Sequence, residues 1–123
     1  MKLTPYEVFN WKITPFKPYS EPESRDFLSN VKWGEYNEVR FKIITNKYLL
    51  YVFDNTMQTA LHWAAKWNYY EIILFLIERG ANVNSLDIGW RTPLFIASKC
   101  GHLEAVKALL SGKADPSYKT YSN

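Results

Sequence analysis

Residues 59–68 read "TALHWAAKWN", and residues 92–101, lying 33 positions later, read "TPLFIASKCG". When the second half of the chain is cut into 33-residue lines, it repeats without a gap from position 54 to position 119. Asp54 aligns with Asp87, and most other matches fall at turn and packing positions. A fixed period of this length is typical of repeat architectures, in which each copy forms one supersecondary unit.

Each line encodes the same local structure. A polar turn is followed by a short helix with small residues, a break, and a second helix with bulky apolar residues. Thr92 and Pro93 suit a helix start, because proline at the first helical position lacks an amide that would be unpaired there anyway. Two helices per line cannot bury their apolar faces alone, so neighbouring copies must stack.

The stretches "TALHWAA", "ERGANVN", "RTPLFIA" and "GHLEAVKALL" resemble the ankyrin repeat, whose period is also 33 residues. A weaker third copy lies upstream. The resemblance implies an all-α ankyrin-repeat solenoid of about three helix-turn-helix repeats. Their expected bounds are residues 27–53, 54–86 and 87–119.

The segments outside the repeats differ from them in composition. Residues 1–26 show no repeat pattern and are expected to form an extended arm rich in aromatic residues and proline, whereas residues 120–123 form a C-terminal stub. Rings on an extended, proline-containing chain typically anchor in grooves. We expect the arm to tether the protein into a larger assembly through Tyr6, Phe9, Trp11, Phe16 and Tyr19.

The two histidines do not indicate catalysis. The resemblance implies that Thr59 and His62, like Thr92 and Pro93, belong to the structural motif of the repeat, in which threonine and histidine hold adjacent turns together. The sequence contains no phosphate-binding glycine loop, nucleophile elbow or zinc-binding helix motif. We therefore expect no enzyme activity, no catalytic residue, no metal and no cofactor.

Composition indicates the cellular environment and the class of partner that we expect. The net charge is only +3, with mixed signs along the chain, so nucleic acid is not the expected partner. Cys100 is the single cysteine, which favours a reducing, intracellular environment. No apolar stretch is long enough to span a membrane. We expect a cytoplasmic protein, with a mitochondrial or cytoskeletal complex left open.

Partner contacts in the ankyrin family come mainly from the turn tips and the inner face of the first helix. Stacking predicts that Lys32, Lys66 and Lys99 form one column beside Trp33 and Trp67, although the two rings could instead pack on each other and cover a repeat junction. Met57 and Trp90 stand at turn positions usually given to glycine. The expected partner-binding residues are Lys32, Trp33, Met57, Gln58, Lys66, Trp67, Ile88, Trp90, Arg91 and Lys99.

These features predict a non-catalytic protein-protein interaction module, acting as a small accessory subunit or adaptor within a larger complex. Its expected partners are other protein subunits, and no small-molecule substrate is expected. An alternative is a regulatory inhibitor that binds and blocks a partner enzyme. Nucleic-acid binding through the lysine and tryptophan columns is a third hypothesis, which the low net charge makes weaker.

Overall fold

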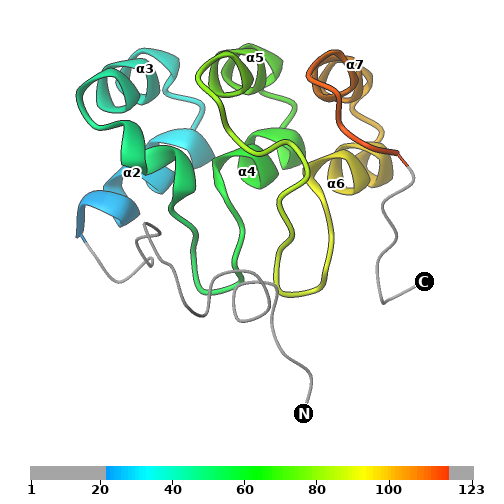
Figure 1. Cartoon of the computed structure of the whole chain (residues 1–123), viewed down its shortest axis with the longest axis horizontal. Coiled ribbons are helices and arrows are strands. Elements are labelled where there is room, and N and C mark those ends of the chain that lie inside the picture. The colour runs from blue at the N-terminus through cyan, green and yellow to red at the C-terminus, as the bar shows by residue number, and fades with distance from the viewer. Residues whose placement is uncertain (1–21, 117–123) are drawn as a thin grey trace.

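The computed structural model describes residues 22–116, which form three stacked helix pairs. One layer contains α2, α4 and α6, the other contains α3, α5 and α7, and the turns that join successive pairs project to one side (Figure 1). The prediction of an all-α ankyrin-type solenoid is confirmed for this range. The elements are α2 (Pro22–Lys32), α3 (Tyr36–Thr45), the 3-10 helix η1 (Lys47–Tyr51), α4 (Ala60–Lys66), α5 (Tyr70–Glu78), α6 (Pro93–Cys100) and α7 (Leu103–Ser111).

The first helices of the pairs lie close together because small residues face the core. Ala64, Ala65 and Ala97 are completely buried. The second helices fill the remaining space with branched and aromatic side chains, of which Ile73, Leu76 and Leu109 are also completely buried. One apolar core, to which all three pairs contribute, therefore runs along the described part of the chain.

The first helix begins earlier than expected. α2 starts at Pro22, five residues before the predicted start of the first repeat at residue 27. Proline suits the first helical position, and the carboxylate of Glu23 favours the positive end of the helix dipole. The Asn46 amide donates a hydrogen bond of 2.8 Å to Glu23, and Ser24 is only 1% exposed. A contact with the end of α3 in the same repeat thus accompanies the extension of the helix into the segment assigned to the arm.

Lys113 occupies a strained backbone position after α7. Its φ of 67° lies in the left-handed region, as does the φ of 99° at Gly80, the equivalent residue one repeat earlier. The neighbouring Gly112 has a φ of −87° and does not take over this role. A residue with a Cβ atom is less stable than glycine in this conformation.

We predict that Lys113→Gly increases the free energy of unfolding by about 0.5–1 kcal/mol, because relief of the left-handed strain outweighs the added flexibility of the unfolded chain. Urea denaturation measures this change. The matched control is Lys107→Gly within α7, which should decrease stability by about 1 kcal/mol because glycine is unfavourable in a helix interior. If Lys113→Gly and Lys107→Gly destabilise the protein equally, the backbone at Lys113 is not strained.

Candidate functional site

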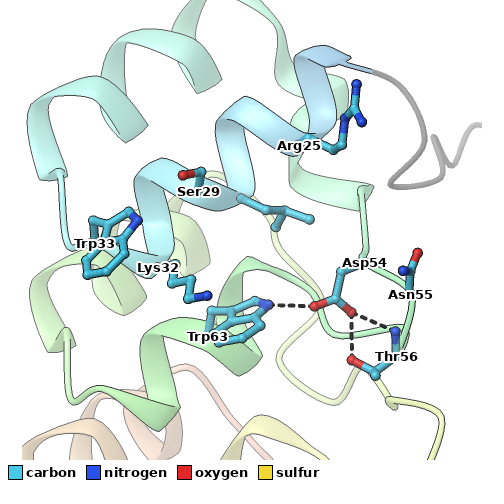
Figure 2. Close-up of a pocket in the computed structure, with 9 residues that line it drawn as sticks. Arg25, Ser29, Lys32, Trp33, Asp54, Asn55, Thr56 and Trp63 are labelled. Carbon is cyan, nitrogen blue, oxygen red and sulfur yellow. Dashed lines mark hydrogen bonds between the residues drawn. The ribbon is translucent and has the colours of Figure 1, made fainter.

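The first projecting turn is organised by the carboxylate of Asp54. One oxygen accepts hydrogen bonds from the backbone amides of Thr56 and Gln58, at 3.0 and 2.9 Å. The other accepts from the indole Nε1 of Trp63, at 2.9 Å (Figure 2). Asp54 therefore fixes the turn and at the same time orients a tryptophan of α4.

The second turn is built around Asp87, whose side chain is completely buried. Its carboxylate accepts from the backbone amides of Gly89 and Arg91, both at 2.9 Å, and forms an ion pair with the Arg91 guanidinium at 3.1 Å. The Gln58 amide reaches it from the first turn, at 3.2 Å. Gln58 and Arg91, which the sequence predicts as partner-binding residues, thus also stabilise the turns, and the Arg91 side chain is still 36% exposed.

His62 links the two turns through both ring nitrogens. Nδ1 accepts from the backbone amide of Thr59, at 3.1 Å, so Nε2 carries the proton and donates to the carbonyl of Arg91, at 2.8 Å. The ring is completely buried, and this desolvation lowers the pKa of His62 below its ordinary value. Within residues 22–116, no three His, Cys, Asp or Glu side chains group as metal ligands. This geometry makes His62 a neutral structural link.

Met57 and Trp90 adopt the left-handed backbone conformation with φ values of 61° and 60°. Both side chains are half-buried, which corrects the expectation that they stand at exposed turn tips. Each residue is the fourth of its turn, and its amide bonds back to the aspartate carbonyl at 2.9 Å. The exposed tips are formed by the residues between, of which Ile88 is 47% exposed.

Cationic and aromatic side chains meet on the inner helices. Trp63 lies between two ammonium groups, with Lys32 Nζ 5.4 Å and Lys66 Nζ 5.0 Å from its ring centroid. Lys32 also lies 5.9 Å from the Trp33 ring, and Lys66 lies 5.7 Å from the Trp67 ring. We call these five residues the lysine-tryptophan row. Lys99 is exposed at the equivalent position of α6.

Two rings of this row, those of Trp33 and Trp67, remain open to solvent. Trp33 is 70% exposed and Trp67 is 48% exposed. The alternative in which these rings pack on each other and cover a repeat junction is therefore wrong. Exposed tryptophan beside lysine has the composition of a protein-binding surface, because buried aromatic anchors supply most of the affinity at such interfaces.

A pocket of about 260 Å³ lies at one end of the row, between α2, the first turn and α4. In Figure 2 the Lys32 side chain extends toward Trp63, and Trp63 toward Asp54. Arg25, Ser29 and Asn55 complete its polar lining. Its volume is below the roughly 300–1,000 Å³ of small-molecule sites. A single side chain of a partner is the better match for this space.

Sequence reasoning missed Trp63 and Arg25 as surface residues. Trp63, Lys66 and Trp67 are spaced i, i+3 and i+4, so they share one helix face, and this spacing could have added Trp63 to the predicted surface. The position of Arg25 could not be inferred, because the residue had been assigned to the arm. The expected arm anchors Tyr6, Phe9, Trp11, Phe16 and Tyr19 lie outside the described residues.

A family model described as ankyrin repeats, in three copies, matches residues 35–87 and 47–120. The chain belongs to the ankyrin repeat family. Ankyrin repeats mediate contacts between proteins, so this chain contains a protein-protein interaction module. In the part that the structure describes, no helix is long and apolar enough to cross a membrane.

Similar segments occur within much longer proteins. The chain is 42% identical over 64 residues to palmitoyltransferase Hip14 of Drosophila melanogaster, which is 51% of this chain and 10% of that protein. It is 43% identical over 54 residues to Rabankyrin-5 of Homo sapiens, which is 44% of this chain and 5% of that protein. Palmitoyltransferase ZDHHC17 of Homo sapiens is 34% identical over 94 residues, or 75% of this chain and 15% of its own length.

We predict that His62→Gln decreases the free energy of unfolding by about 1–3 kcal/mol, because the bond to the Arg91 carbonyl is lost within the core. The pH dependence should change as well. Since the pKa of His62 is lowered on folding, the unfolded chain takes up the proton first, and stability falls as pH drops below 6.5. This loss should be smaller in His62→Gln.

Thermal unfolding is measured between about pH 7.5 and about pH 5.5, because an ordinary histidine side chain changes its charge in this pH range. His102→Gln is the matched control, because this ring is half-buried and bonds to the Lys66 carbonyl at 3.0 Å. The control should keep the acid sensitivity of the natural chain. If His62→Gln and the natural chain lose the same stability as pH falls, the role of His62 as a neutral link between the turns is refuted.

Proposed function

We propose that the protein is a small adaptor or accessory subunit that joins other proteins into a complex. The observation that supports this most directly is the lysine-tryptophan row, which presents two open indole rings directly after the C-terminal ends of α2 and α4. Rigid aromatic groups lose little conformational entropy on binding and bury much apolar area. The row and the Ile88 tip would together contact the partner.

No catalytic role is proposed for any residue of the row. The imidazole of His62 is buried between two turns, with both nitrogens bonded, so it is not available to a substrate. Two of the similar proteins are named palmitoyltransferases, but the chain spans only 10% and 15% of their lengths. Our proposal therefore takes from them only the repeat architecture. It includes no cofactor, nucleic acid or small-molecule substrate.

An intracellular location is part of the proposal. Cys100 has an exposed thiol at the end of α6. In an oxidising compartment, such a thiol is prone to form disulfides between molecules, whereas glutathione keeps it reduced in the cytosol. The cytoplasm is the simplest site consistent with this chemistry.

We predict that the double change Trp33→Ala and Trp67→Ala decreases the affinity for the native partner by at least about tenfold, because two exposed anchors are lost. Affinity purification of the tagged full chain from its native source identifies the partner, and titration of that partner measures the change. Circular dichroism should show unchanged helicity, because neither ring belongs to the core.

Leu74→Ala is the matched control for this experiment. Leu74 is 46% exposed but lies on α5, in the opposite layer, so its removal should leave affinity unchanged. If the tryptophan changes leave partner binding intact, the proposed surface is wrong. If the captured partner is an enzyme whose activity falls on binding, the protein is a regulatory inhibitor rather than an adaptor.

A further inference from the structure

The inner face carries positive charge that no ion pair within residues 22–116 neutralises. Lys32, Lys66 and Lys99 are exposed, and Arg25 lies at the pocket beside Lys32. Among residues 22–116, the carboxylate found within ion-pair distance of a cationic side chain is Asp87, and it binds Arg91. The four cations of the inner face therefore have no carboxylate partner in this range.

Two acidic side chains of this region, Asp54 in the pocket lining and Asp87 in the second turn, are already bound within the turns. Asp54 accepts from the Thr56 hydroxyl at 2.8 Å, in addition to two backbone amides and the Trp63 indole. Asp87 is completely buried and bonded to both turns. These hydrogen bonds hold both carboxylates within the turns, and among residues 22–116 neither carboxylate lies within ion-pair distance of the three lysines.

Contact with the tryptophan rings orders the ammonium groups but leaves their charge intact. A cation over an aromatic ring is attracted by the quadrupole of the ring, which carries no net charge. Lys32 and Lys66 are both held over Trp63, so their positions are defined before a partner arrives. Charges fixed in this way lose little entropy when they bind an anion.

We propose that the lysine-tryptophan row binds an acidic segment of a partner protein. Carboxylates of that segment lie against Lys32 and Lys66, its apolar side chains cover the open faces of Trp33 and Trp67, and one side chain enters the pocket beside Arg25. This inference rests on the proposed function and adds the chemical class of the partner. Charge complementarity between the row and the segment supplies the specificity.

A protein segment fits this surface better than single-stranded nucleic acid. Nucleic acid of that kind binds through bases stacked on open aromatic faces. The Trp63 ring has ammonium groups of two lysines over it, at 5.4 and 5.0 Å, which leaves it a poor stacking platform. The pocket of about 260 Å³ accommodates an amino-acid side chain.

Selection of a random peptide library on the immobilised full chain tests the proposal without knowledge of the partner. Enriched peptides should contain an excess of Asp and Glu next to aromatic or aliphatic residues. The double change Lys32→Glu and Lys66→Glu should remove that excess and weaken binding of an enriched peptide at least about tenfold. The matched control is Lys107→Glu on α7, an exposed lysine of the opposite layer, and it should change neither result.

Each alternative outcome has a distinct meaning. Enriched peptides without acidic residues that still require Trp33 and Trp67 would overturn the charge proposal and leave the interaction module standing. Failure of any peptide to enrich would also overturn it. An oligothymidylate probe that displaces the enriched peptides and binds more tightly than they do would replace the protein partner with nucleic acid. If the affinity for the native partner does not depend on Trp33 or Trp67, the proposed function itself is refuted.

Discussion

The structure depends on the alignment of neighbouring turns by one buried imidazole. His62 joins the amide that begins α4 to the Arg91 carbonyl, which immediately precedes α6. The starting points of two inner helices are thereby fixed relative to each other, and the small residues of those helices can pack closely. Because a neutral ring with one donor and one acceptor satisfies both bonds, burial is compatible with this role.

The same turns determine the charge of the binding surface. An aspartate in each turn accepts backbone amides together with a side chain from another element, Trp63 for Asp54 and Gln58 for Asp87, and among residues 22–116 neither forms an ion pair with the exposed lysines. A structural requirement of the repeat thus leaves the inner face cationic. The charge of this surface depends on which charged side chains are bonded within the fold. The net charge of +3 for the whole chain does not show which side chains these are.

Strain is also concentrated near this surface. Met57 and Trp90 adopt left-handed backbone conformations at corresponding positions of the two turns, where glycine would be less strained. Each is held by a backbone bond of 2.9 Å to the aspartate carbonyl of its turn. The side chains of Met57 and Trp90 are half-buried in the turns, whereas the neighbouring Ile88 is exposed.

The sequence alone determined the period and the three helix pairs, because these follow from local periodicity and from the equivalence of repeats. Tertiary structure decided which polar side chains remain available. Gln58 meets Asp87 across 29 positions, and Lys32 meets Trp63 in the next repeat, so neither contact could be read from local spacing. The Glu23 side chain near the start of α2 likewise bonds to Asn46, 23 positions later in the chain, at the end of α3. Contacts between repeats are set by three-dimensional stacking, which the pattern within a single repeat does not encode.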